Sequence, residues 1–274
     1  MAAPDDTAPA GPTYAEVKAG LTAPLVEMMT TQRAVRRLKP DPVDDDIVLR
    51  CIELSLKAPT GSNGQNWEFV VVKDAATKAA LAQRYRQAWR LYGGIGHWLA
   101  EQSQTTTGIA GFIGRATGRS ATDDTGAGDD GMAKILRAVQ WQVDHFEELP
   151  VLVVPCLRGS KAPFVPMPAI AETSYYGSIY PSVQNLLLAA RAMGLGASLI
   201  TLPLWSMTSV RKALGLPLSV QPCCVVPLGW PHGRYGPTTR RPVGDVVHLD
   251  RFGNRPWVGE RLEDGPPEPT TPPT

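Results

Sequence analysis

Apolar residues along this chain follow two alternating patterns, a helical spacing of three to four residues and short unbroken runs. Between residues 132 and 146 the apolar side chains recur at helical spacing, and residues 151–157 (VLVVPCL) follow as a short apolar run. The first pattern predicts a helix with one buried face, and the second predicts a buried strand. By the same reasoning we expect helices over residues 22–29, 44–58, 74–91, 179–193 and 206–214, and strands over residues 67–72, 197–202 and 223–228.

Strands separated by long helices predict a mixed α/β domain of the α+β class. The regular repeat of about 30 residues that is typical of a barrel or a doubly wound sheet is missing. No linker divides two cores, so we expect one domain over residues 21–251, between a flexible tail (1–20) and a proline-rich tail (252–274). Residues 93–131 are rich in Gly and Asp, which predicts a mobile insertion or a lid over a site.

Composition and charge narrow the classes of function. The 274 residues are 43% hydrophobic and 19% charged, as in an ordinary globular protein. The formal net charge of +1 creates no global field, so neither nucleic acid nor an anionic membrane is expected as a partner. No apolar run approaches the roughly 18 residues of a membrane span, and residues 1–13 lack the features of a signal peptide. The four cysteines lack the spacing of a metal site or a disulfide framework, which favours buried thiols in a reducing, cytoplasmic location.

The usual nucleotide-binding and nucleophile motifs do not stand where they would carry a function. No GxGxxG follows the first predicted strand, and the chain contains no GxxxxGK[ST] or GxSxG. Residues 194–196 (GLG) end a predicted helix, where a helix stop explains them better than a phosphate cradle. The four histidines are scattered, so we expect no metal site.

A basic cluster followed by a polar loop is the strongest candidate for a binding site. The cluster contains Arg33, Arg36, Arg37 and Lys39, and the loop at residues 59–66 runs directly into a predicted strand. Phosphate prefers forked guanidinium donors, and the edge of a planar heterocycle prefers amide and hydroxyl groups. The two features together indicate a site for a heterocycle that carries a phosphate. The alternative is a solvated basic turn followed by an ordinary helix-to-strand connection.

Four motifs, in this order along the chain, resemble the nitroreductase family of FMN-dependent oxidoreductases. Members of that family typically show Arg-Arg-Ser-x-Arg-x-Phe-x-Pro, then Ala-Pro-Ser-x-x-Asn-x-Gln-Pro-Trp, a helix with Gln-Asn-Leu-Leu-Leu-Ala-Ala before Gly-Leu-Gly, and a closing basic motif. The resemblance covers about residues 23–243. The matching stretches here are Gln32-Arg33-Ala34-Val35-Arg36-Arg37-Leu38-Lys39-Pro40, Ala58-Pro59-Thr60-Gly61-Ser62-Asn63-Gly64-Gln65-Asn66-Trp67, Gln184-Asn185-Leu186-Leu187-Leu188-Ala189-Ala190 before Gly194-Leu195-Gly196, and Arg240-Arg241-Pro242.

The chain departs from the family pattern at three places. Ala34 replaces the commoner Ser, which removes one hydrogen bond of about 1 kcal/mol, a loss that cofactor binding should survive. Asn66 replaces the Pro before the Trp, and residues 93–131 are longer than a minimal family member needs. The substrate preference is the inference that these departures affect most.

The resemblance also implies residue roles. Arg33 and Arg240 would bind the phosphate of FMN, and Arg36 would lie near the N1 edge of the ring. Residues 34 and 35 would contribute backbone groups, and residues 200–202 would pack on the ring and offer a backbone N–H to N5. The implied cofactor-binding residues are Arg33, Ala34, Val35, Arg36, Pro59, Thr60, Gly61, Ser62, Asn63, Gln65, Ile200, Thr201, Leu202, Arg240 and Arg241.

The resemblance also implies a particular fold and a particular activity. We expect a central mixed, mostly antiparallel sheet flanked by helices, in a homodimer with FMN at the interface. The activity would be hydride transfer from NADH or NADPH and reduction of nitroaromatic, quinone or similar small aromatic acceptors by a ping-pong mechanism. Flavin N5 would carry the hydride, so no catalytic side chain is expected. Two alternatives stay open: a specialised flavin chemistry such as dehalogenation or flavin fragmentation, and a flavin-binding or storage protein without turnover.

Overall fold

In the computed structural model, which describes residues 11–102, 129–159 and 169–259, the sheet is built around one central strand, β2 (Val151–Arg158). The strand is buried from its first residue through Leu157. Because successive side chains of a strand point to opposite faces, this burial means that both faces of the sheet are covered. The residues divide between two hydrophobic clusters, with Val151, Val153 and Leu157 in the first and Leu152, Val154 and Cys156 in the second.

All strand pairs in the described part of the chain are antiparallel. β1 (Trp67–Val72) lies along one edge of β2, and β5 (Val226–Gly229) and β4 (Val220–Pro222) pair with the other edge. β3 (Gly196–Ala197) pairs with β5, which makes the order β1-β2-β5-β3 with β4 beside β2. The predicted α+β class with an antiparallel sheet is confirmed.

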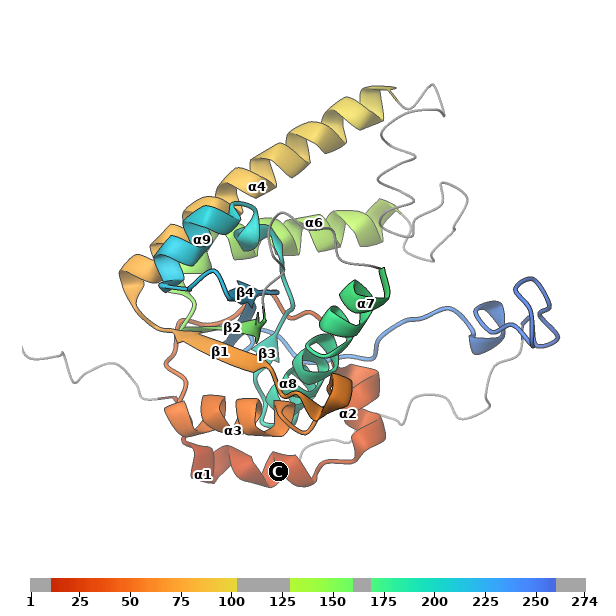
Figure 1. Ribbon diagram of the computed structural model, residues 1–274, viewed down its shortest axis with the longest axis horizontal. Coiled ribbons are helices and arrows are strands. Elements are labelled where there is room, and N and C mark those ends of the chain that lie inside the picture. Colours follow the sequence, from red (N-terminus) through yellow and green to blue (C-terminus); the bar gives the residue numbers. More distant parts are fainter. Residues whose placement is uncertain (1–10, 103–128, 160–168, 260–274) are drawn as a thin grey trace, which may run out of the picture.

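Helices cover both faces of this sheet (Figure 1). The first cluster is covered by α3 (Asp45–Ser55) and α8 (Tyr180–Ala192). The second is covered by α4 (Ala75–Gln102), α6 (Asp129–Asp144) and α9 (Met207–Leu214). The other helical segments, with η marking a 3-10 helix, are α1 (Tyr14–Val17), η1 (Lys18–Thr22), α2 (Leu25–Thr31), η2 (Gly61–Asn63), η3 (Phe146–Glu148), α7 (Ala169–Gly177), η4 (Leu202–Leu204) and η5 (Val243–Asp245).

The helices predicted after Asp44 and Asp74 are confirmed, and each begins at an acidic cap. Asp44 Oδ1 accepts a hydrogen bond from the Asp46 N–H at 3.0 Å, and Asp74 Oδ2 accepts one from the Thr77 N–H at 2.7 Å. α4 continues to Gln102, so the start of the predicted insertion at 93–131 is helical. Residues 103–128 of that insertion lie outside the described residues, and the lid stays a prediction. None of the helices in the described ranges is both long and apolar enough to cross a bilayer.

The predicted N-terminal tail over residues 1–20 is too long. Residues 14–22 form α1 and η1, and Tyr14, Val17 and Leu21 pack against the first cluster. Thr13 and Glu16 form a capping box at the start of α1, and the Tyr14 N–H donates to Asp44 Oδ2 at 3.0 Å. The described body therefore begins before residue 21.

Three further differences from the predicted elements have local causes. The strand expected over 197–202 is only β3 plus an isolated bridge between Ile200 and Val225, because the chain turns into η4 at Pro203, which has no N–H for a ladder. The strand expected over 223–228 begins only at Val226, as β5, after an isolated bridge at Val225, and β4 lies before the expected range. α7 was not predicted, because its sequence is only weakly amphipathic and it follows a proline-rich stretch.

Residues 239–259 extend away from the layered body as an arm (Figure 1). Phe252 is 91% exposed on this arm. The predicted domain boundary at residue 251 falls within this arm. Further exposed apolar side chains of the arm are Val243, Val246, Leu249 and Val258.

Candidate functional site

Backbone hydrogen bonds hold the basic segment at residues 33–39 against the end of the sheet. The Val35 N–H donates to the Ala197 carbonyl at 2.9 Å, and the Lys39 N–H donates to the Trp230 carbonyl at 2.7 Å. Leu38 is buried between these bonds, whereas the side chains of Arg33, Arg37 and Lys39 are exposed. The segment therefore presents its cations at the surface while its apolar residues anchor it.

A glycine makes this close approach possible. A Cβ atom on Gly196 would lie 2.5 Å from Leu38 Cδ2 and 2.7 Å from Val35 Cγ1, which is too short for any real contact. Gly196 belongs to the GLG sequence that was predicted to be a helix stop, and the φ of Gly194 (+81°) agrees with that role. Gly196 has the additional role of letting the basic segment lie on β3.

One predicted backbone contact is not open to a ligand. Because the Val35 N–H already bonds to Ala197, it is engaged inside the protein. A backbone N–H from residues 34 and 35 is thus available only at Ala34, which is exposed.

The segment that leads into Arg240, far along the chain, runs to the same corner. Both the N–H and the Oγ1 of Thr238 donate to the Thr30 carbonyl, at 2.9 and 3.1 Å. The position that a Cβ would take on Gly236 lies 4.0 Å from Arg33 Nη1. The segment that leads into Arg240 therefore runs beside the segment that leads into Arg33. Arg240 and Arg241 are both exposed.

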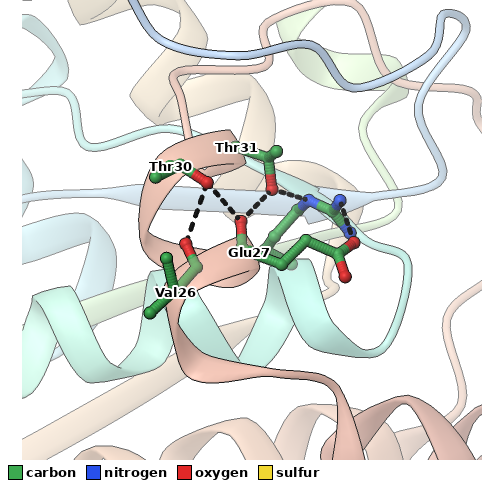
Figure 2. Close-up of polar contacts among 5 residues, drawn as sticks. Val26, Glu27, Thr30 and Thr31 are labelled. Atoms are coloured by element: carbon green, nitrogen blue, oxygen red, sulfur yellow. Dashed lines mark hydrogen bonds and ion pairs between the residues drawn. The ribbon is translucent and has the colours of Figure 1, made fainter. Parts of the chain in front are cut away.

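The last turn of α2, just before Arg33, is held by its own threonines (Figure 2). Thr30 Oγ1 donates to the Val26 carbonyl at 2.8 Å, and Thr31 Oγ1 donates to the Glu27 carbonyl at 2.6 Å. Such back-bonding satisfies the threonine hydroxyl groups within the last turn of the helix. The Thr30 carbonyl itself accepts a hydrogen bond from outside the helix, from Thr238.

Arg191 of α8 joins the end of α2, which leads into Arg33, to the segment around Tyr235, which leads into Arg240. Its Nε donates to Thr31 Oγ1 at 3.0 Å, its Nη2 lies 3.7 Å from Glu27 Oε1, and its Cζ lies 3.8 Å above the ring of Tyr235. The side chain is only 14% exposed, so these contacts are weakly screened. Sequence reasoning missed this residue, since nothing in its neighbourhood along the chain distinguishes it from a surface arginine at a helix C-terminus.

Replacing Arg191 with Met is expected to destabilise this junction. The change keeps most of the aliphatic stem but removes a hydrogen bond, an ion pair and a cation–π contact, together worth about 1–3 kcal/mol. For a domain of this size, the midpoint of thermal unfolding should fall by about 2–12 °C. Circular dichroism measures it, with Arg90→Met, which removes an exposed arginine of α4, as the control. Equal midpoints for the two variants would show that the junction contributes nothing.

Arg36 is the one cation of the cluster that turns partly inward. It is half-buried, and its Nε has no hydrogen-bond partner in the structure. Burial lowers the pKa of its guanidinium; the phenol of Tyr85 opposes this shift and the charge of Arg33 adds to it. The ion pairs among the described residues include none with Arg36. A partly desolvated cation without an acidic partner is suited to stabilising negative charge on a ligand.

Behind Arg36 lies a chain of buried polar groups that the sequence did not reveal. The Tyr85 hydroxyl donates to Gln142 Oε1 at 3.3 Å, and Gln142 Nε2 donates to Ser198 Oγ at 3.0 Å. Gln142 and Ser198 are fully buried. Burial raises the pKa of Tyr85 to about 12, so its phenol stays neutral at physiological pH. Arg36 therefore remains the charged group in this chain of contacts.

The polar loop at residues 59–66 has an unusual backbone. Ser62, Asn63 and Gln65 have φ angles of 52°, 52° and 47°, which is rare for residues other than glycine. The loop is anchored at its start, because the Gly61 N–H donates to Ser178 Oγ at 3.1 Å. Strained backbone that displays exposed polar side chains is commonly found at binding sites.

The loop and the basic segment are held by different elements of the chain. The loop bonds to Ser178, at the corner between α7 and α8, and Trp67 Nε1 donates to the Ser178 carbonyl at 2.6 Å. Residues 33–39 bond instead to β3 and to residues 230–232. In the described part of the chain, no hydrogen bond joins the loop to residues 33–36. The structure thus brings Arg33, Arg36 and the segment that leads into Arg240 to one corner, and it anchors Gly61 elsewhere.

Residues 200–202 lie beside a pocket of about 340 Å³. Ile200 is 8% exposed, and both its backbone groups pair with Val225, at 3.0 and 2.8 Å. Its N–H is therefore engaged, and the N–H predicted to reach the ring must come from Thr201 or Leu202. Thr201 is exposed at the pocket. The described residues that line the pocket are Tyr176, Tyr180, Thr201, Leu204, Met207, Gln221, Pro222 and Cys223.

Known proteins share both the sequence pattern and the fold. The family model described as "Nitroreductase family" matches residues 29–230. NADH dehydrogenase of Thermus thermophilus is 38% identical over 65 residues, 23% of this chain and 32% of that relative, so the match spans about a third of its length. Iodotyrosine deiodinase 1 of Rattus norvegicus is 23% identical over 230 residues, 81% of this chain and 67% of the relative.

A solved structure of iodotyrosine deiodinase bound to FMN and 3-iodo-L-tyrosine is similar with a TM-score of 0.57. The identity is 20%, and the match covers 84% of this chain and 100% of the other. At this level of identity the similarity establishes a common fold.

Proposed function

This chain belongs to the nitroreductase family, and we propose that it binds FMN and uses NADH or NADPH to reduce nitroaromatic, quinone or similar acceptors. The observation that carries the proposal is the corner where Arg33, Arg36 and the segment leading to Arg240 meet. FMN is bound in the iodotyrosine deiodinase structure of the same fold.

The charges at this corner suit FMN. A phosphate needs forked, solvent-accessible donors, and the guanidinium groups of Arg33 and Arg240 are exposed and form no ion pair with an acid among the described residues. The reduced ring needs a fixed positive charge near its N1 edge, and Arg36 has the half-buried position and the unpaired Nε for that task. The donor set therefore fits both ends of the cofactor.

The residues of the chain bind and orient, and the cofactor carries the redox chemistry. When bound, FMN would supply the redox chemistry of a ping-pong reaction, which takes a hydride equivalent from NAD(P)H and delivers the electrons to an acceptor. Arg36 would stabilise the negative charge that reduction creates. The strained loop, through Ser62, Asn63 and Gln65, would contact the ring and the ribityl chain, with Thr201 or Leu202 near N5. No side chain needs to act as a nucleophile.

A second copy of the chain would complete each site. The basic corner and the strained loop are anchored on different elements, and the arm at residues 239–259 exposes apolar side chains such as Phe252 and Val258. Exposed apolar arms are typical of chains that wrap around a partner. A homodimer with FMN at the interface would cover the arm and bring the loop of one subunit to the arginines of the other. None of the four cysteines, all of which lie among the described residues, forms a disulfide; this suits a reducing compartment, and we place the protein in the cytoplasm.

Reductive dehalogenation is the second candidate. It is favoured by the similarity to iodotyrosine deiodinase 1, which extends over 81% of this chain. Dehalogenation would release halide from a haloaromatic substrate, whereas nitro or quinone reduction would not.

The test is a flavin absorbance spectrum of the purified protein, recorded before and after NADH or NADPH is added. We expect a yellow protein that bleaches with at least one nicotinamide and recovers its colour with menadione or a nitroarene. A protein that takes up no FMN would refute the proposal. Halide release from 3-iodotyrosine with little menadione reduction would favour dehalogenation.

A further inference from the structure

The pocket beside Thr201 has aromatic and apolar walls. The rings of Tyr176 and Tyr180 lie 6.0 Å apart and nearly parallel, with 25° between their planes. Leu204 and Met207 contribute from η4 and α9. Flat phenol faces and a polarizable thioether favour contact with the π-face of another ring. Its volume of about 340 Å³ is near the lower end of small-molecule sites.

Polar groups are present at the same pocket. Gln221 Nε2 donates one hydrogen to the Tyr176 hydroxyl at 3.2 Å. An amide nitrogen carries two hydrogens, so the Gln221 side chain keeps a second donor in addition to its carbonyl oxygen. Thr201, which also lines the pocket, adds a hydroxyl as a further polar group. Amide and hydroxyl donors can bind the oxygen atoms of a quinone or a nitro group.

The lining is also neutral. None of the described residues that line the pocket is Asp, Glu, Lys or Arg. A dinucleotide carries phosphates, and a free amino acid carries two opposite charges; burying either without a paired charge is costly. The cations that suit a phosphate lie instead at the corner with Arg33 and Arg240. The pocket therefore offers no charged partner to either kind of ligand.

From these observations we infer that the pocket is the acceptor site, and that it takes a neutral, planar aromatic molecule of one or two rings between the tyrosines and Met207. The inference rests on the proposed function, since Thr201 must lie beside the flavin. A quinone bound there gains two electrons and two protons to become a hydroquinone. The electrons and one proton come as a hydride equivalent from NAD(P)H through the flavin, and the second proton comes from water.

The inference is tested first by binding, which does not require turnover. Isothermal titration calorimetry of the FMN-loaded protein is expected to show saturable binding of 1,4-naphthoquinone. Binding of 1,4-naphthoquinone-2-sulfonate and of 3-iodotyrosine should be at least about tenfold weaker, because their charges meet no partner. Met207→Trp, which fills the pocket, should weaken naphthoquinone binding by about tenfold or more. Gln221→Leu should weaken it by about fivefold through the loss of a hydrogen bond.

The control variant is Leu218→Trp, which adds the same indole at a side chain that is 79% exposed and outside the pocket lining. It should bind naphthoquinone like the parent protein. Equal affinity of the Met207→Trp variant and the parent, or tighter binding of the sulfonate, would overturn the inference. So would a large loss of FMN affinity in Met207→Trp with unchanged naphthoquinone binding, since the pocket would then hold the flavin itself.

Steady-state kinetics separates this inference from the proposed function. In Met207→Trp, kcat/KM for menadione should fall about tenfold, whereas in Leu218→Trp it should stay within about twofold of the parent value. If the parent protein binds naphthoquinone but oxidises neither nicotinamide, the proposed function fails and the pocket assignment as an acceptor site fails with it. If the parent turns over menadione and Met207→Trp does so equally well, only the pocket assignment fails.

Discussion

Replacing both Arg33 and Arg240 with Ala is expected to weaken FMN binding by at least about 100-fold. Each guanidinium would contribute a charge-assisted hydrogen bond of about 1.5–3 kcal/mol, and each single variant should lose about 10- to 100-fold in affinity. The two residues come from distant parts of the sequence, but Thr238 and Thr30 hold their segments side by side. Titration of FMN into the apoprotein, followed by quenching of flavin fluorescence, measures the effect.

Riboflavin provides a specific control for this prediction, because it has the ring and the ribityl chain of FMN but no phosphate. Its affinity should change little in the Arg33 and Arg240 variants. Arg90→Ala, which removes an exposed arginine from α4, should leave the affinity for FMN unchanged. If riboflavin binding falls as much as FMN binding, the arginines support the fold or the ring and the phosphate lies elsewhere.

Replacing Arg36 with Met is expected to lower the reduction potential of the bound flavin by about 30–60 mV. The estimate takes an interaction with the reduced ring of about 1.5–3 kcal/mol and converts it at about 30 mV per 1.4 kcal/mol for two electrons. The physical reason is that Arg36 is half-buried with an unpartnered Nε, so its charge is poorly screened by water. Flavin reduction by NAD(P)H should become correspondingly slower. Spectrophotometric reduction against a reference dye measures the potential.

The same variant is expected to leave the apoprotein equally stable or more stable. Burial lowers the pKa of Arg36, which means that the folded protein disfavours its charged form. Replacing a partly buried, unpaired cation with an apolar side chain of similar length is often neutral or stabilising. Arg37→Met is the matched control, since it removes the same charge from an exposed neighbour. If Arg37→Met shifts the potential as much as Arg36→Met, general electrostatics and not the position of Arg36 sets it.

Local patterns along the chain were sufficient to predict many of the helices and strands. The apolar run at residues 151–157 became β2, and the acids at positions 44 and 74 became helix caps, because these features depend on near neighbours. The same local reasoning failed for residues 197–202, where a bridge to Val225 replaces a longer strand. It also failed for residues 14–22, whose helices are stabilised by packing on distant residues.

The candidate site divides in the same way. The sequence by itself determined the family resemblance, the basic segment with Arg33 and Arg36, the polar loop at residues 59–66 and the basic pair that begins at Arg240. Only the tertiary structure decided that Arg36 is half-buried and that the N–H groups of Val35 and Ile200 are engaged. It also revealed Arg191, the chain from Tyr85 to Gln142, and the neutral pocket at Gln221. The reason is that burial, strain and pairing are set by residues far apart in sequence, which spacing along one chain does not encode.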